Sequence, residues 1–439
     1  MIGSARWLCV ALVLCLSTPA LADGLTLEAA VKLALLNNER AKKAPLRVQV
    51  AESQLERARD GYLPTLTASG STTYRPEARA GNNPTSNAAL TLNQPLLSPS
   101  FFPQYSQQKH NVESERWGSQ QDQRQLAFEA AKAFVQALAA DNVVASAQRK
   151  LDSAKLNLET SQARASAGLA STNDVTKAEL QLATTQGQLA NAQGNVKRTY
   201  IALSFLLAQK VEGPLVPPDN TTRAAQQFEQ ARANQVKTAL DRRARVLAAA
   251  QERRPDVRAL QERNAGLEDS AKEPLYRLIP SVSASGQLRL VPDPLPNDNA
   301  LDEQVSVNLN WQLFDAGFRY ADRKQRLAQL ESARLDEKLL KRSVQNEIEL
   351  ALVALRAARE NYRTALSAAG AAQKNAEETG VLYQQGLARA IEVNDANDKQ
   401  FEADVTSASA KLSMEQAYLD LRSALGFGPL DQDKQTVAK

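Results

Sequence analysis

The 439-residue sequence has a mean hydropathy of -0.41, and beyond residues 1–22 it has no apolar stretch of the roughly 18 residues that an inner-membrane helix needs. Its 53 basic and 49 acidic side chains are spread along the chain, so nothing resembles a patch that could follow a phosphate backbone, and nucleic-acid binding is excluded. Aromatic residues make up only 5%, while Ala and Gln abound, which favours long helices with narrow contacts over a wide globular core.

Residues 1–22 have the pattern of a secretory signal peptide. Arg6 precedes the apolar run from Trp7 to Leu16, and small residues at Ala20 and Ala22 form a cleavage site. The apolar run is about half the roughly 20 residues that a spanning helix needs. We therefore expect export, with the mature chain beginning at Asp23.

The residue types that common catalytic and metal sites need are scarce. Cys9 and Cys15 both lie in the predicted signal peptide, so the mature chain has no thiol. It has one histidine, His110, in a stretch of Gln and Lys where we expect a solvated surface position, and it has no Gly-rich phosphate loop. We predict that the protein is not an enzyme and uses no cofactor and no metal.

The chain contains one pattern twice, at an offset of 216 to 218 positions. The matching segments are Leu63–Gly70 with Ile279–Gly286, Leu92–Leu96 with Leu309–Leu313, Gly168–Ala170 with Gly386–Ala388, and Tyr200–Leu207 with Tyr418–Leu425. One such match would be weak evidence, but four in the same order indicate a tandem duplication. Each repeat should contain a helix, two strands around a loop, and two long helices.

The strands are predicted from alternation of apolar and polar residues with a period of two. In the second repeat the alternation runs from Val282 to Leu290 and from Val305 to Leu313, and it is weaker around Leu66 and Leu90 in the first. Segments rich in Pro, Asn, Asp and Gly separate the paired strands and predict loops at 77–86 and 292–302.

Such strands, taken alone, suit half-buried hairpins of a soluble domain as well as a membrane barrel. The exported context favours the barrel, because strands of roughly 10 residues can cross an outer membrane at a tilt. One polar and one apolar face is the pattern of a water-filled barrel. Four strands cannot close a barrel, since the smallest known have about eight. Several copies of the chain would have to share one.

Apolar residues at alternating steps of three and four positions predict coiled-coil helices. The pattern runs from Ala133 to Leu158 and from Ala178 to Leu206, and again from Val344 to Tyr383. A helix from near Phe318 to Gln385 would be on the order of 100 Å long at 1.5 Å per residue, so it must protrude from any compact core. An ordinary antiparallel coiled-coil stalk explains these heptads equally well, although it does not explain the strands.

Gly168 and Gly386 interrupt the heptads, and we expect the chain to reverse there. Each is followed by an acidic residue, Asp174 or Glu392, near the start of the next helix. A carboxylate in the first helical turn suits the helix dipole. Helix capping is therefore the alternative to any other role of these two acids.

These features together resemble the TolC-like outer membrane efflux proteins over essentially the whole mature chain. Besides the duplication, the resemblance is carried by Leu25–Ala30 with Asn37 and Asn38, the strand starts at Pro64 and Pro280, Arg254–Val257, Gln312–Gly317 and both Gly-Leu-Ala turns. The first repeat departs from the pattern, because Gln94–Ser100 lacks the usual Asp and Gly. The start of the first long helix, near Phe101 to Gln104, is therefore left open.

The resemblance implies a mainly α fold with a membrane β part. Three chains would contribute four strands each to a twelve-stranded outer-membrane β-barrel, continued into the periplasm by a long α-helical coiled-coil barrel. It also implies an equatorial region. The chain then divides into a signal peptide at 1–22, a first repeat at 23–210, an equatorial linker at 211–255, a second repeat at 256–426 and a tail at 427–439.

The resemblance further implies a gate where the tunnel closes at its periplasmic end. The residues carried over to it are Asp174, Tyr383, Glu392 and Asp395. Threefold symmetry would bring three copies of Asp395 together, where like charges repel and attract cations. An Arg that takes part in some relatives is replaced here by Ala388, with Arg389 one position later, so that link is in doubt.

We therefore predict an outer-membrane exit duct of a tripartite efflux pump or of a type I secretion system, passing small molecules or unfolded polypeptide to the exterior. The implied partners are a periplasmic adaptor, an inner-membrane pump and the lipid of the outer membrane. Adaptor hairpins dock at the exposed turns in relatives, which makes Gly168, Leu169, Gly386 and Leu387 candidate contacts.

The alternatives make different demands on the sequence. A periplasmic coiled-coil adaptor should have a single hairpin, flanking β domains and usually an inner-membrane anchor. A filamentous coiled coil should lack the four alternating segments. The residues do not specify the cargo, nor whether the partner pump is of the RND or the ABC type.

Overall fold

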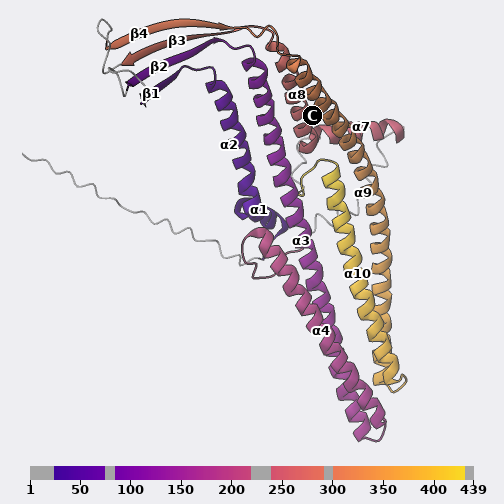
Figure 1. Cartoon of the computed structure of the whole chain (residues 1–439). Helices are drawn as coiled ribbons and strands as arrows, with labels where there is room; N and C mark the ends of the chain where they lie inside the picture. The colour runs from indigo at the N-terminus through magenta and orange to yellow at the C-terminus, as the bar shows by residue number, and fades with distance from the viewer. Residues whose placement is uncertain (1–23, 75–84, 219–238, 291–299, 431–439) are drawn as a thin grey trace, which may run out of the picture.

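The computed structural model describes residues 24–74, 85–218, 239–290 and 300–430. The predicted signal peptide and most of both predicted inter-strand loops lie outside these residues. Within them, a small sheet extends sideways as an arm from one end of the molecule, and the long helices run downward from that end, at an angle to the strands (Figure 1). No helix of the described residues combines the length and the apolarity that a membrane crossing needs.

The sheet is antiparallel, and its strands follow one another in chain order. They are β1 (Thr65–Thr73), β2 (Thr85–Leu97), β3 (Ser281–Leu290) and β4 (Leu301–Asn310). The central pairing, between β2 and β3, joins the two repeats. Strands β1 and β4 lie at the two edges of the sheet.

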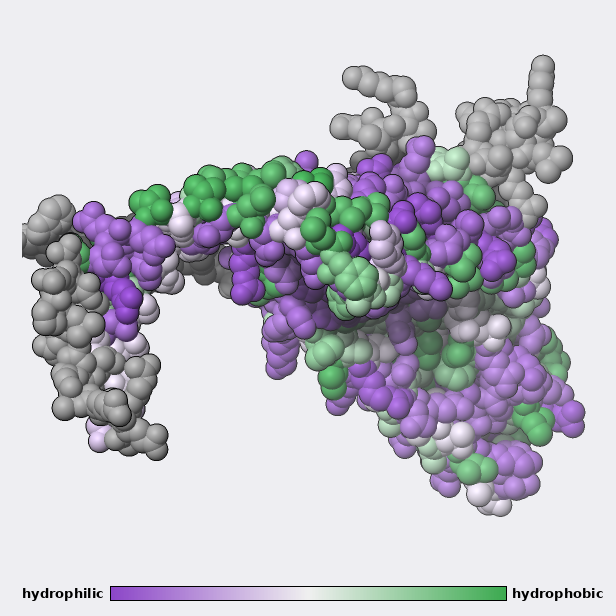
Figure 2. Space-filling view, turned by 45° about the horizontal axis from the view of Figure 1, so that its top comes forward, coloured by the Kyte–Doolittle hydropathy of each residue, from purple (hydrophilic) through white to green (hydrophobic). Residues whose placement is uncertain are grey.

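The register of the sheet produces one apolar and one polar face. Leu66 lies opposite Leu92, Leu92 opposite Gly286, and Gly286 opposite Val305. The next row on the other face contains only Thr67, Thr91, Gln287 and Gln304. Figure 2 shows hydrophobic side chains gathered in a row along the arm that the strands form. The two-faced strands predicted from the alternation are therefore confirmed.

Strand β4 ends before the predicted end at Leu313. Its pairing with β3 stops at Asn310, which lies opposite Ser281. The indole of Trp311 then donates a hydrogen bond of 3.0 Å to the Leu278 carbonyl, while the chain turns into the next helix. The sequence pattern placed the strand end too late, because Trp311 and Leu313 continue the alternation of apolar and polar residues although they are exposed and lie outside the sheet.

The helices repeat in the same order around each strand pair. The first repeat contains α1 (Leu27–Asn37), α2 (Glu39–Asp60), α3 (Phe101–Ser166) and α4 (Thr172–Leu207); the linker contains α7 (Ala239–Arg253); the second repeat contains α8 (Pro255–Tyr276), α9 (Phe318–Gln384) and α10 (Ala390–Ala424). The two hairpins α3–α4 and α9–α10 are the long rods that the heptads predicted. From Val344 to Tyr383, every residue of α9 that belongs to the predicted pattern of three- and four-residue steps is buried or half-buried.

Two apolar clusters form where the shorter helices surround these rods. Phe134 of α3, Leu203 of α4 and Leu419 of α10 belong to the first cluster, together with residues of α1. Val344 of α9 and Met414 of α10 belong to the second. Further along the hairpins the seams are rich in Ala, which permits close approach but buries little area. Most of the apolar burial therefore lies near the middle of α3 and α9, beside the C-terminal ends of α4 and α10.

The two long helices begin in different ways. Before α9, the Asp315 carboxylate accepts hydrogen bonds from the backbone N–H groups of Gly317, at 3.1 Å, and Arg319, at 2.9 Å. Gly317 has a φ of +86°, which favours glycine there. In the first repeat α3 begins at Phe101, after Ser100, whose side chain makes no capping bond. Without the Asp and Gly of the second repeat, the first long helix thus begins without a side-chain cap.

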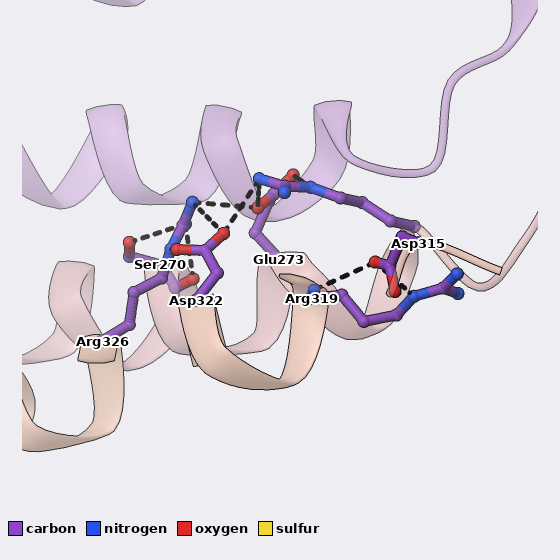
Figure 3. Close-up of polar contacts among 7 residues, drawn as sticks. Ser270, Glu273, Asp315, Arg319, Asp322 and Arg326 are labelled. Atoms are coloured by element: carbon purple, nitrogen blue, oxygen red, sulfur yellow. Dashed lines mark hydrogen bonds and ion pairs between the residues drawn. The ribbon is translucent and has the colours of Figure 1, made fainter. Parts of the chain in front are cut away.

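A group of ion pairs joins the end of α8 to the start of α9, beside the strands (Figure 3). The buried Glu273 carboxylate lies 2.7 Å from the Arg277 guanidinium and 3.1 Å from that of Arg326. Asp322 pairs with the same two arginines, at 3.2 and 3.0 Å. Burying a charge without a partner costs several kcal/mol, so this pairing fixes how the second strand pair meets its helices.

Candidate functional site

The free ends of the two helical hairpins contain all the residues that the sequence proposed for a gate or for docking. The chain reverses at Gly168, with a φ of +71°, and at Gly386, with a φ of +80°. Each glycine is followed by a leucine that is largely exposed, 75% for Leu169 and 73% for Leu387. A single chain thus presents one uncovered apolar side chain at each turn.

The two acids that follow the turns both cap helices. The backbone N–H of Asp174 donates to the Ser171 hydroxyl at 3.2 Å, and the Asp174 carboxylate accepts from the Ser171 N–H at 3.3 Å. Glu392 accepts from the Arg389 N–H and from its guanidinium, both at 3.0 Å. The backbone hydrogen bond and then the guanidinium hold the pKa of Glu392 below its ordinary value. The capping alternative is realised for both residues.

Tyr383 connects the two hairpins. Its ring is buried, and its hydroxyl lies 3.2 Å from the Ser161 hydroxyl of α3. Arg164, also on α3, donates to the Tyr383 carbonyl at 3.1 Å and places its guanidinium 4.8 Å from the centre of the ring. Ser161 and Arg164 were not predicted from the sequence. Ser161 lies on the heptad seam, where a polar residue is a signal for a specific partner.

Asp395 differs from the other three candidates. It is exposed on α10 and makes no hydrogen bond or ion pair with the described part of the chain. Its charge adds to the effect of Glu402, which raises the pKa of Lys399 by a hydrogen bond. No hydrogen bond or ion pair among the described residues links the four predicted gate residues to one another. Of these four residues, only Tyr383 makes hydrogen bonds between the two hairpins in the described part of the chain.

A lysine that the sequence did not single out joins α3 to α10 further from the turns. The Lys150 side chain is buried, and its ammonium lies 2.8 Å from the Asp398 carboxylate. It also donates to Gln188 of α4 at 2.9 Å and lies 4.7 Å from the centre of the Phe401 ring. Asp398 accepts a further hydrogen bond of 2.7 Å from Gln181 of α4. Three of the four long helices therefore meet at this one ion pair.

Two more polar contacts follow the same seam between α3 and α10. Arg149 pairs with Asp404 at 2.8 Å, and the Asn157 amide donates to Asn394 at 2.6 Å. An open cleft of about 600 Å³ lies between α3, α9 and α10 at this level, and Tyr383 contributes to its lining. The hairpin ends are thus held together mainly by polar side chains around a solvent-accessible cleft.

The lone histidine is not the solvated surface residue that the sequence suggested. Nδ1 of His110 lies 2.8 Å from the Glu262 carboxylate of α8, and the side chain is half-buried. Gly266 of α8 makes this close approach feasible, since a Cβ there would lie 3.3 Å from the Cβ of His110. A contact between two helices so far apart in the chain leaves no local mark in the sequence.

A family model described as outer membrane efflux protein matches residues 30–209 and 246–427, which include most of both repeats. The chain belongs to the outer membrane efflux protein family. It is an outer-membrane exit channel for efflux, as the duplication and the motifs predicted, and the periplasmic adaptor alternative is excluded. No curated protein sequence matches this chain.

Solved structures share this fold at low sequence identity. The channel-forming CusC is 17% identical, with a TM-score of 0.76 and 92% of each chain covered. The CmeC outer membrane channel of Campylobacter jejuni is 18% identical, with a TM-score of 0.74, 92% of this chain and 86% of that chain covered. The open state of the Neisseria gonorrhoeae MtrE outer membrane channel is 19% identical, with a TM-score of 0.73 and coverages of 92% and 89%.

Proposed function

We propose that three copies of this channel share one β-barrel in the outer membrane and one helical tunnel below it. The observation that carries this proposal is the sheet itself. It has an apolar and a polar face, and both of its edges, β1 and β4, lack a partner strand among the described residues. Four strands cannot close a barrel, and unpaired edges are not tolerated in the hydrocarbon of a membrane. Pairing of β4 with β1 of the next copy satisfies both demands.

The hairpin ends act as the gate of this tunnel. Tyr383 holds the α9–α10 hairpin to α3, and Lys150 holds α10 to α3 at a position further from the turns. Asp395 forms a ring of three carboxylates that favours cations over anions at the narrow end. Asp174 and Glu392 act indirectly, because they cap the helices on which the ring and the turns are built. The open state solved for MtrE supports the idea that such a tunnel can open.

The turns are the contact sites for a periplasmic adaptor, which connects the channel to an inner-membrane pump. Gly168 with Leu169 and Gly386 with Leu387 supply a tight reversal and an exposed apolar side chain in each repeat. A helical hairpin with an apolar stripe would cover these leucines. The channel contributes a passage for small molecules or unfolded polypeptide and no catalysis of its own.

The proposal is tested by measuring the conductance of the purified mature protein in a planar lipid bilayer, together with its mass in mild detergent. We expect the mass of a trimer and small, cation-selective currents. A single-chain mass, or a trimer without any current at elevated voltage, would contradict the shared channel.

A further inference from the structure

The chain changes in chemistry where strand β4 leads into helix α9. Val307 and Leu309 lie on the apolar face of the sheet and are largely exposed. Trp311, Phe314 and Phe318 follow them and are exposed as well. The hydrophobic row along the arm reaches the place where the arm meets the helices (Figure 2). An apolar surface that passes into an aromatic one has the order in which a bilayer changes from hydrocarbon to interface.

A stripe on the first turns of α9 continues from these aromatic residues. Tyr320 and Leu327 each lie three or four positions from both Arg323 and Lys324, so the four residues share one side of the helix. Tyr320 is 62% exposed, and Lys324 is exposed beside the half-buried Arg323. This side of α9 thus presents two adjacent cations between an aromatic and an aliphatic side chain.

The basic residues on the side of α9 that faces α8 are neutralised within the chain. Arg319 pairs with Asp315 at 2.8 Å. Arg326 pairs with Asp322 at 3.0 Å and with Glu273 of α8 at 3.1 Å (Figure 3). These arginines hold the helices together and have no charge left for a ligand.

The two cations of the stripe are different. Arg323 and Lys324 make no hydrogen bond or ion pair with the described part of the chain. Within that part, the Nε atom of Arg323 is buried and still has no hydrogen-bond partner. A covered donor without an acceptor is costly, so this position favours an anionic ligand.

The distance of these cations from the strands fits the headgroup of a phospholipid. Arg323 follows Phe318, the first residue of α9, by five positions, which is roughly 8 Å at 1.5 Å per residue. The headgroup region on each side of a bilayer is roughly 5–8 Å deep. Long basic side chains at this depth keep their aliphatic parts on apolar surface while their charges reach the polar layer. If β4 crosses the hydrocarbon, the two cations lie at the level of the phosphates.

The corresponding part of the first repeat has different chemistry. At the offset of 217 that relates the ends of the strands, Arg323 and Lys324 correspond to Ser106 and Gln107, which are neutral. The Ser106 hydroxyl donates to the Asp269 carboxylate of α8. The charge of the stripe is therefore a feature of the second repeat, and each chain supplies one site.

We propose that the stripe formed by Tyr320, Arg323, Lys324 and Leu327 binds the phosphate of an anionic phospholipid in the inner leaflet of the outer membrane. The inference rests on the proposed barrel, because it needs β4 to cross that membrane. A lipid is the occupant because the cations continue the apolar and aromatic surface of the strands, and because their charge is complementary to an anionic headgroup. The bound lipid fixes the depth at which α9 leaves the membrane.

Native mass spectrometry of the purified mature protein with added lipid tests this site. The test variant carries Arg323→Gln with Lys324→Gln. The matched control carries Lys197→Gln with Arg198→Gln, an exposed pair of adjacent basic residues on α4 that also makes no hydrogen bond or ion pair with the described residues. We expect the unsubstituted trimer to retain severalfold more phosphatidylglycerol than phosphatidylcholine. The test variant should lose most of this excess, and the control should keep it.

A charge-preserving exchange, Arg323→Lys with Lys324→Arg, should retain the lipid and separates loss of charge from a local disturbance of α9. A trimeric test variant that binds phosphatidylglycerol as well as the unsubstituted protein would overturn the site. An excess of inorganic phosphate should leave the lipid bound, because Tyr320 and Leu327 add apolar contacts. Displacement by phosphate would reveal a simple anion site and overturn the lipid assignment. A single-chain mass of the unsubstituted protein would contradict the shared barrel instead, so the two failures are distinguishable.

Discussion

Acidic residues that look equivalent in the sequence have different surroundings near the turns. Asp174 and Glu392 lie in first helical turns and bind backbone N–H groups there. Asp395 lies beyond the first turn of α10, where no free backbone N–H remains for it to bind. The sequence predicted the caps from position alone. It could not show that Asp395 makes no hydrogen bond or ion pair with the described residues, because that depends on which side of α10 faces the other helices.

This difference separates two effects that one double variant would combine. Asp395→Asn should weaken the cation preference and raise the single-channel conductance, because it removes an exposed charge and no capping bond. Asp174→Ala should lower the stability of the α3–α4 hairpin by roughly 0.3–1 kcal/mol, because the carboxylate's part of the capping box is lost while Ser171 still accepts from the backbone N–H of residue 174. Bilayer currents and thermal unfolding measure the two. Unchanged currents for Asp395→Asn would remove it from the gate.

The cap at Glu392 should depend on pH. Its pKa is lower in the folded protein than its ordinary value of 4.5, because the Arg389 backbone N–H and guanidinium bind the charged form. A lowered pKa gives a stabilisation that is fully present above the ordinary value and is lost as the pH falls through the lowered one. We therefore expect the α9–α10 turn to remain protected at pH 5 and above and to loosen below about pH 4.5.

Hydrogen exchange of the first amides of α10 checks this expectation, with Glu392→Gln as the control. The control has no carboxylate to titrate, so its protection should be weaker and should not change over the same pH range. Equal pH dependence in both proteins would assign the effect to another group.

Helices and strands were largely predictable as elements, whereas the contacts between the hairpins were not. The heptad period placed α9 within a residue of its observed end, because a seam repeated over many turns averages out local exceptions. The start of α3 was left open because Gln94–Ser100 lacks the Asp and Gly found before α9, and in the structure Ser100 makes no capping contact of the kind that Asp315 makes there. Lys150 was not recognised, because a single lysine beside a seam resembles any solvated side chain.

The Lys150–Asp398 pair should stabilise the closed arrangement of the hairpins. Asp398→Leu leaves the buried ammonium without its counterion, which costs about 3 kcal/mol and should raise the conductance by loosening α10 from α3. The double variant Lys150→Met with Asp398→Leu removes both charges and should recover much of the stability. Chemical denaturation of the four proteins of this cycle gives the coupling between the two residues.

Arg149→Ala is the comparison for this cycle. Arg149 pairs with Asp404 from a largely exposed position, so its loss should cost less than about 1 kcal/mol. Equal effects of Arg149→Ala and Asp398→Leu on stability and on conductance would mean that burial of Lys150 has no special role.

At the scale of the whole molecule, the sequence predicted a closed β-barrel, which the four strands of a single chain cannot form. The alternation defined an apolar and a polar face, and the register aligns these faces across all four strands. The strand ends were less predictable, because Trp311 and Leu313 continue the alternation after pairing has stopped. The number of strands predicted that one chain leaves its sheet open. Which strands form the edges, and which face of α9 stays exposed, follow from pairing and packing that a sequence does not display.

Neighbouring positions of β4 provide a direct test of which face meets lipid. Val307 lies on the apolar face, opposite Ala284, and Asn308 on the polar face, opposite Ser283. Val307→Lys places a charge toward the hydrocarbon, which costs about 2–4 kcal/mol near the middle of a bilayer. Asn308→Lys places the same charge toward the water-filled interior, where it should be tolerated and should reduce the cation preference of the current.

The two variants should therefore differ in where the protein is found. We expect Val307→Lys to lower the fraction recovered in outer-membrane fractions severalfold, while Asn308→Lys remains at the level of the unsubstituted protein. The same lysine on the same strand controls for charge and for strand propensity, so only the direction of the side chain differs. If both variants inserted equally, the apolar face would not be the one that contacts lipid, and the barrel would have to be assembled with the opposite face outward.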